Sequence, residues 1–488
     1  MAVLKLSTPG VYVQEIPAFP PSVAEVETAI PAFIGYTEKA DKLAAGDLIM
    51  IPTKISSLAE FEVLYGGAPM EKDDSITITV NDAGSGQYDV KLTYDNTKRS
   101  KYNLYYSIKS FYDNGGGTCF IVAADTYAGA AGAIKEADLT GGLDKVKDVD
   151  EVTLLAIPEA ANIDNVNPAS YLNVVQAMIK QAADPNLRDR FAIIDPYRVT
   201  PKSKTYTDGD LDTDIKFIRD SCALGADFLR YAAAYFPSLI TTYPHKYDFD
   251  NLTVDAYTLA AGATASIPIA AGNKMSQFTG SVFYNKVQAV LNTEWVVLPP
   301  SGAMAGLYTR VDNTKGVWKA PANENVFSVV APYIDLSNRQ QENLNVDPVS
   351  GKSINVIRTF PGYGTLVWGA RTLNGNDNEW RYISVRRFFN MVEESIKKSI
   401  QWAVFEPNTI STWIKVSAMI ENYLFIKWRD GALAGSKPEQ AFYVHVGLGT
   451  TMTALDVLEG RMNVEIGMAV ARPAEFVVLK FTQLMQQS

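Results

Sequence analysis

Val152-Thr-Leu-Leu-Ala-Ile-Pro158 is a short apolar run that ends at a proline, and Phe191-Ala-Ile-Ile-Asp-Pro196 repeats this pattern further along the chain. Between the two runs, residues 169 to 183 place apolar side chains at helical spacing, which predicts an amphipathic helix. Short apolar strands that alternate with helices favour a mostly parallel sheet. This stretch therefore predicts an α/β fold.

The alternation of strands and helices continues on both sides of this stretch. Strands are expected at residues 30–36, 119–124 and 231–235, and helices at 57–65, 103–113, 212–221 and 281–291. Two segments depart from the pattern. Residues 75–94 alternate with period two around a turn-rich centre, which predicts a β-hairpin inserted at 71–100. Residues 245–275, rich in Ala, Gly and Thr, are expected to form an irregular insertion.

The C-terminal third has a different character. Helices are expected over residues 384–404 and 409–429, separated by Pro407-Asn408. A strand is expected at 442–446, and two more between 463 and 481 around Arg472-Pro473. At the other end, residues 7–21 are expected to form an extended arm, in which residues 11–16 are strand-like and the four surrounding prolines exclude a helix. Because this terminal arm is too short to form a sheet by itself, it needs a partner strand from elsewhere.

Composition limits the possible functions. The 488 residues carry a net charge of -10, so broad binding to nucleic acid phosphates is not expected. Cys119 and Cys222 are isolated, as are His245 and His445, so neither a zinc site nor another metal site is predicted. We expect no secretion signal, no membrane-spanning segment and synthesis in the cytoplasm.

Catalytic motifs are not recognisable. Gly351-Lys352-Ser353 resembles the end of a phosphate-binding loop, but Val346 stands where that loop needs its first glycine. Two histidines outside any motif argue against a histidine-based triad. Carboxylates are numerous enough that a glycosidase-like pair stays open. We expect a protein that is not an enzyme and has no cofactor.

Several segments together resemble the contractile tail sheath family of myophages, R-type bacteriocins and extracellular contractile injection systems. They follow one another in this order: Pro9-Gly-Val-Tyr-Val-Gln-Glu-Ile16, Phe111-Tyr-Asp-Asn-Gly-Gly116, Leu298-Pro-Pro-Ser-Gly-Ala303, Gly316-Val-Trp-Lys-Ala-Pro-Ala-Asn323, Gly364-Thr-Leu-Val-Trp-Gly-Ala-Arg-Thr372, Trp380-Arg-Tyr-Ile-Ser-Val-Arg-Arg387, Gln401-Trp-Ala-Val-Phe-Glu-Pro-Asn408, Gly431-Ala-Leu-Ala-Gly435 and Arg472-Pro-Ala-Glu-Phe476. Their order and their spread over the chain make the resemblance specific.

The resemblance implies a mixed α/β subunit of several domains. Residues 1–30 would hold the N-terminal arm and the first part of the sheath core, and 31–70 with 101–330 an outer α/β domain. Residues 71–100 would be a surface β insertion, and 331–488 an α/β C-terminal core ending in a second arm.

The resemblance also implies a mechanism, in which terminal arms add strands to a small sheet of neighbouring subunits. The arm residues would be Val11, Tyr12, Val13, Gln14 and Ile16 at the N-terminus, and Val477, Leu479 and Phe481 at the C-terminus. Candidate contacts to an inner tube are Lys415, Lys427 and Arg429.

The implied partners are further copies in stacked hexameric rings that form a helical cylinder, an inner tube protein, and baseplate and terminator proteins. Nucleic acid and direct membrane insertion are not expected. The particle would be a phage tail or a tail-like device. The alternatives are a static shell or surface-layer protein and, less favoured, an α/β hydrolase.

Overall fold

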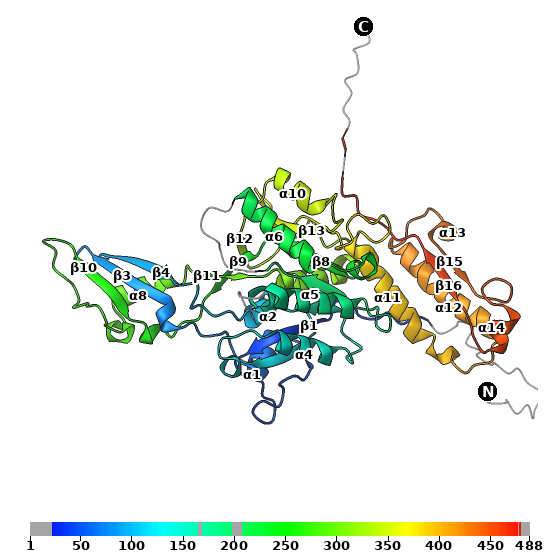
Figure 1. The fold of residues 1–488 in the computed structure, drawn as a ribbon, viewed down its shortest axis with the longest axis horizontal. Coiled ribbons are helices and arrows are strands. Elements are labelled where there is room, and N and C mark those ends of the chain that lie inside the picture. The colour runs from blue at the N-terminus through cyan, green and yellow to red at the C-terminus, as the bar shows by residue number, and fades with distance from the viewer. Residues whose placement is uncertain (1–21, 164–167, 198–206, 477, 480–488) are drawn as a thin grey trace, which may run out of the picture. The chain divides into compact units, whose positions relative to one another are not determined.

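The computed structural model describes residues 22–163, 168–197, 207–476 and 478–479. The chain divides into two compact units (Figure 1): a large unit, residues 27–391 and 472–488, and a small unit, residues 1–26 and 392–471. Helix α11 (Ile383–Ser399) begins in the large unit and ends in the small one. The C-terminal core was expected to begin at residue 331, whereas the units divide between Met391 and Val392.

The large unit is built on one eight-stranded sheet. Neighbouring strands run in the order β14 (Gly364–Val367), β13 (Ile354–Phe360), β8 (Ala232–Phe236), β7 (Phe191–Ile194), β6 (Leu154–Ala156), β1 (Pro31–Thr37), β5 (Cys119–Thr126) and β2 (Thr53–Ile55). All neighbours are parallel except the two edge pairs, β13–β14 and β2–β5. The mostly parallel α/β sheet predicted from residues 152–196 is therefore confirmed.

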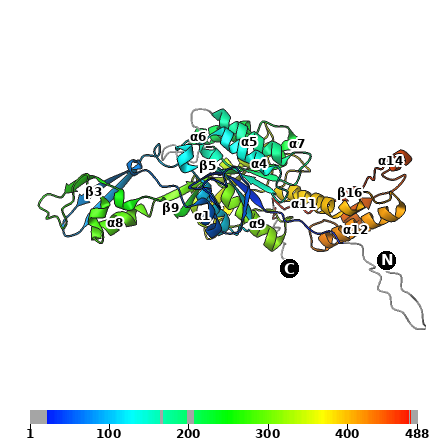
Figure 2. The same cartoon turned by 90° about the horizontal axis from the view of Figure 1, so that it is seen from below.

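Helices cover both faces of this sheet (Figure 2). One layer contains α4 (Glu136–Val146), α5 (Pro168–Ala182) and α6 (Asp208–Ser221), and the other α1 (Leu58–Tyr65), α2 (Leu104–Asp113) and α9 (Ser301–Lys315). Successive strand residues point to opposite layers: Phe33 joins the second core and Ile34 the first. Because both faces are buried, the strands are continuously apolar rather than alternating.

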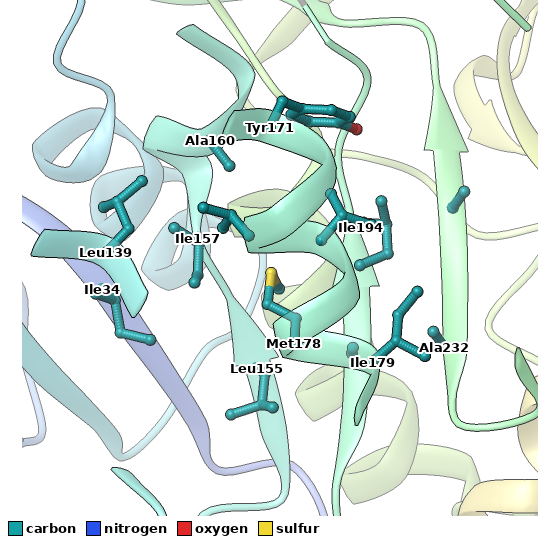
Figure 3. Close-up of a cluster of buried hydrophobic side chains, with 14 of the residues drawn as sticks. Ile34, Leu139, Leu155, Ile157, Ala160, Tyr171, Met178, Ile179, Ile194 and Ala232 are labelled. Atoms are coloured by element: carbon teal, nitrogen blue, oxygen red, sulfur yellow. The ribbon is translucent and has the colours of Figure 1, made fainter. Parts of the chain in front are cut away.

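Helix α5 shows how the sequence pattern becomes packing (Figure 3). Its Tyr171, Met178 and Ile179 lie against Leu155 and Ile194 of the strands beneath, and all five are at most 2% exposed. Burying such side chains contributes about 1.5–3 kcal/mol each. The apolar spacing that predicted the helix overlaps in part with the stripe that faces the sheet.

Helix α9 was not anticipated, because it is rich in small residues and buried almost all round. It packs directly on α2 through two glycines. A Cβ atom at Gly302 would lie 2.4 Å from the carbonyl oxygen of Ser107, and one at Gly306 would lie 2.3 Å from that of Phe111. The two backbones approach this closely only because neither glycine has a side chain.

The predicted hairpin consists of β3 (Ile76–Asp82) and β4 (Tyr88–Tyr94), but it does not stand alone. β10 (Val254–Leu259) pairs in parallel with β3, and α8 (Val282–Leu291) shares their apolar core. The expectation of an irregular insertion over 245–275 is therefore wrong for its central part. Its short strand lacks an alternating pattern, since only Val254 of β10 is buried. We call residues 72–99 together with 247–293 the outer β domain.

The large unit contains a second three-stranded sheet, and two of its strands flank residues 247–293 in the sequence. β9 (Leu239–Pro244) lies between β11 (Trp295–Leu298) and β12 (Val329–Pro332), antiparallel to both. Short helices complete the large unit: α3 (Tyr127–Ala130), α7 (Ala226–Leu229) and α10 (Asn338–Asn345).

The small unit contains the end of α11, then α12 (Ile410–Arg429), α13 (Pro438–Ala441) and α14 (Ala454–Leu458). Its strands are β15 (Phe442–His445) and β16 (Glu465–Met468). The two long helices and the strand at 442 are confirmed. The last predicted strand is not found in the described part of its range, since residues 471–476 and 478–479 form neither strand nor helix.

Candidate assembly elements

The small unit carries a two-stranded antiparallel sheet. Phe442 is opposite Met468 and His445 is opposite Glu465, and within the described parts of the chain no third strand joins β15 or β16. Helix α12 covers one face, where Val444 is buried. A strand edge without a partner presents free backbone donors and acceptors, so this sheet can accept a further strand.

The centre of this sheet depends on one glycine. The ring of Tyr443 lies across Gly467, where a Cβ atom would come within 2.2 Å of the ring. Tyr443 also donates a hydrogen bond to Glu465 (3.0 Å) and stacks on His445 with ring centroids 4.7 Å apart. The exposed face of the sheet is thereby filled by its own side chains.

The segment that follows the N-terminal arm lies along α11 within the small unit. The backbone N–H of Ala24 donates to the hydroxyl of Ser399 (3.2 Å), and that of Val26 donates to Ser395 (3.1 Å). Glu25 between them pairs with Lys427 of α12. The predicted arm residues Val11, Tyr12, Val13, Gln14 and Ile16 lie outside the described residues.

Farther along, the segment is fixed within the large unit by a buried ion pair. Arg387 of α11 donates to Asp312 of α9, and both side chains are 4% exposed. Arg387 also donates to the carbonyl oxygen of Thr28, whose hydroxyl donates to Asp312. Burial acts to lower the pKa of Arg387, but the Asp312 charge outweighs it and the pKa is raised. This guanidinium therefore stays charged.

The C-terminal arm begins beside a second ion pair of the large unit. Arg371 is 4% exposed and donates through Nε and Nη2 to both oxygens of Glu475, at 2.7–3.2 Å. Asn345 and Tyr382 donate to the same carboxylate, at 2.8 and 3.2 Å. Burial acts to raise the pKa of Glu475, but these donors lower it overall.

Beyond Glu475 the apolar side chains are exposed. Phe476, Val478 and the predicted arm residue Leu479 are 72%, 78% and 71% exposed. Val477 and Phe481 lie outside the described residues. Exposed apolar side chains at the end of a chain are typical of a segment that binds a partner.

The three candidate tube contacts differ in their surroundings. Lys415 is exposed on α12, and Arg429 is exposed at its end, where it contacts Asp430 (3.7 Å). The Lys427 side chain is only 9% exposed, pairs with Glu25 and lies 5.6 Å from the centre of the Tyr423 ring. Lys427 therefore stabilises the small unit in this structure, and Lys415 and Arg429 are left as the surface cations of the set.

Sequence reasoning missed both ion pairs. Arg371 and Glu475 both occur in the segments that carry the family resemblance, but they are 104 positions apart. The available signal was one arginine and one carboxylate in two separate motifs, and nothing in the sequence pairs one with the other.

The phosphate-loop-like Gly351-Lys352-Ser353 has a structural role. Lys352 donates to the carbonyl oxygen of Arg219 (2.6 Å) and Ser353 to that of Asn345 (2.6 Å). Among the residues that the structure describes, no three His, Cys, Asp or Glu side chains lie where they could hold a metal ion. Over the same residues, no helix is both long and apolar enough to cross a membrane.

Comparison with known proteins identifies relatives of both the sequence and the fold. The family model of the phage tail sheath C-terminal domain matches residues 375–483. The tail sheath protein of Enterobacteria phage T4 is 30% identical over 132 residues, which cover 26% of this chain and 19% of the T4 protein. The chain thus matches about a fifth of the length of this relative.

Two solved structures are similar along nearly the whole chain. One is the anti-feeding prophage helical sheath in its contracted state, with a TM-score of 0.63 and 29% identity, covering 98% of this chain and 99% of that one. The other is the PVC sheath complex of an extracellular contractile injection system, also contracted, with a TM-score of 0.62, 29% identity and 98% coverage of both chains.

Proposed function

We propose that this chain belongs to the contractile tail sheath family and is a structural subunit of a contractile sheath. The proposal is supported by the match of residues 375–483 to the phage tail sheath C-terminal domain and by the similarity of nearly the whole chain to two contracted sheath structures. It polymerises into stacked hexameric rings that form a helical cylinder around an inner tube. The cylinder ends at baseplate and terminator proteins. Contraction drives the tube through a target envelope.

The observation that carries this proposal is the two-stranded sheet β15–β16, which no third strand joins among the described residues. The arms of neighbouring copies add strands to it. The N-terminal arm leaves the small unit at Ala24 and Val26, and the C-terminal arm leaves the large unit at Glu475. Both terminal segments thus begin from fixed points, and backbone hydrogen bonds supply the affinity.

Energetics favour a cooperative lattice over isolated pairs. About five backbone hydrogen bonds in one arm contribute roughly 0.5–1.5 kcal/mol each. Ordering the arm costs about 1–2 kcal/mol per residue. One arm alone is therefore marginal, whereas two arms and the contacts between bodies act together, since each later contact is effectively intramolecular.

Contraction requires two packings of the same subunits. The bodies rotate and move outward, and new contacts between rows favour the contracted state, while the arms keep neighbours connected. The extended state is metastable, so the free energy stored in it drives contraction without consumption of a chemical energy source. The non-enzymatic role follows from the structural nature of the family.

Substitution of Val13 by proline or by threonine tests the strand exchange. Val13→Pro removes a backbone donor from the N-terminal arm, whereas the matched control Val13→Thr keeps the donor and the β-branched shape. We expect Val13→Thr to form hollow striated cylinders by electron microscopy and Val13→Pro to remain a folded monomer. Normal cylinders from Val13→Pro, or from a chain lacking residues 2–16, would refute the strand-exchange mechanism.

Microscopy of the unaltered protein separates the alternatives. Flat lattices would favour the static shell or surface-layer protein. Monomers at every concentration would count against both assembled forms and would favour the α/β hydrolase. Cylinders that shorten on treatment with mild denaturant would support the contractile sheath.

A further inference from the structure

The carboxylate of Glu475 is the last strongly bound group before the C-terminal arm. Four hydrogen-bond donors from three separate parts of the large unit converge on it: two from Arg371, one from Asn345 in α10 and one from Tyr382. Its neighbours Phe476, Val478 and Leu479 are exposed. The chain thus changes at this residue from firmly held to solvent-facing.

Arg371 is itself tied to the large sheet. Its backbone N–H donates to the side chain of Asn355 (2.8 Å), and its carbonyl oxygen accepts from the same amide (2.8 Å). Asn355 is a buried residue of β13 and also donates to the carbonyl oxygen of Ala234 in β8 (3.2 Å). A continuous path of hydrogen bonds therefore runs from Glu475 through Arg371 and Asn355 to β13 and β8 of the large sheet.

The remaining donors of Arg371 hold its side chain in one orientation. Nη1 donates to the carbonyl oxygen of Gly375 (3.1 Å). A planar guanidinium that binds a carboxylate through two nitrogens fixes both the distance and the direction of its partner, which a lysine would not do. The position of Glu475 is thereby defined relative to the sheet.

We propose that Glu475 is the positioning residue that anchors the C-terminal arm to the large sheet, so that a pull on the arm from a neighbouring subunit is transmitted through Arg371 and Asn355 to β13 and β8. This inference rests on the proposed function, and it identifies Glu475 as the residue at which the arm is fixed to the large unit. Without the anchor, residues 472–476 would add unanchored chain to the arm. A longer flexible tether lowers the effective concentration of its end at the neighbouring subunit.

Arm mobility in the unassembled full-length chain tests the anchor directly. A nitroxide attached at Leu479→Cys reports on the arm, and Cys119 and Cys222 are buried and protected from the label. We expect Glu475→Gln to increase label mobility and to speed amide exchange at residues 474–476 by about tenfold or more, as local unfolding becomes easier. Exchange in β13 should not change.

Two further variants extend the test: one should have an intermediate effect, and the other serves as a control. Tyr382→Phe removes only one of the four donors and should produce a smaller effect in the same direction. Lys216→Ala breaks an exposed ion pair with Asp220 on α6 and should leave both readouts unchanged. If Glu475→Gln impairs folding, Tyr382→Phe still decides, because it keeps the charged pair.

The outcomes separate the anchor from the sheath assignment. If deletion of residues 477–488 leaves cylinder formation intact, the role of the arm in the proposed function is wrong. If that deletion abolishes cylinders but Glu475→Gln changes neither label mobility nor exchange, the anchor alone is overturned. Increased mobility with a several-fold lower yield of cylinders would support the anchor.

Discussion

Gly306 of α9 lies so close to the carbonyl oxygen of Phe111 in α2 that a Cβ atom at Gly306 would come within 2.3 Å of it. The obstacle is backbone, which cannot rotate away as a side-chain tip would. We therefore expect Gly306→Ala to push the helices apart and to lower the free energy of unfolding by about 1–3 kcal/mol or more. Urea unfolding of the purified subunit measures this.

Gly141 provides the matched control for Gly306. It lies within α4, and its nearest neighbour would be the methyl group of Met50, at an ordinary 3.7 Å. Gly141→Ala should be neutral or stabilising by up to about 1 kcal/mol, since alanine favours the helix. Equal urea midpoints for Gly306→Ala and the unaltered chain would show that the α2–α9 contact is looser than described.

Glu159 should make stability depend on pH. The side chain is fully buried and accepts hydrogen bonds from the backbone N–H groups of Asn103 and Leu104 at the start of α2 (3.1 and 2.8 Å). Burial raises its pKa to about 8 from an ordinary 4.5, although these donors act to lower it. The folded state therefore keeps a proton that the unfolded state loses near pH 4.5.

The sign of this effect follows from proton linkage. The stabilising contribution of Glu159 is complete below pH 4.5 and is lost as pH rises through about 8. The glutamine of Glu159→Gln cannot ionise. As pH rises from 5.5 to 9, the free energy of unfolding of this variant should therefore increase by a few kcal/mol relative to that of the unaltered chain. The exposed Glu342→Gln should show no such trend. A constant difference between Glu159→Gln and the unaltered chain across this range would contradict the prediction.

The outer β domain should be removable only as a whole. Deleting residues 73–98 alone would remove β3 and β4 and expose Val254, Phe283 and Val287, which are buried against them. We expect that variant to aggregate. Removing 247–293 as well takes away the entire core, so the double deletion should stay soluble and lose only the contribution of α8 to the helix signal in circular dichroism. A soluble, cooperative hairpin deletion would contradict this.

The basic residues of α12 should separate tube binding from stability. Lys415→Glu with Arg429→Glu should weaken co-sedimentation with inner tubes by about tenfold at low salt, and by less at high salt. Lys427→Met should instead lower the melting temperature, because it removes the partner of Glu25. Lys216→Glu on α6 serves as a control for a charge reversal outside α12. Unchanged tube binding in the double variant would exclude this face.

Much of the large unit could be predicted from local pattern. The strands at 152–157 and 191–194 and the helix over 169–183 were correct because burial on both faces leaves a continuous apolar run, and burial on one side leaves a helical stripe. Helix α9 was missed because helices buried all round have no stripe. Strand β10 was missed because a single buried residue provides no alternation.

The sequence by itself determined the element order, the α/β class and the family resemblance, since each depends on residues that are neighbours in the chain. Only the tertiary structure decided which distant residues meet: Gly306 with Phe111, Lys427 with Glu25, and Arg371 with Glu475. Such pairs share no spacing rule. The path of the chain through the fold brings them together, and burial of a charge then requires the partner that the fold supplies.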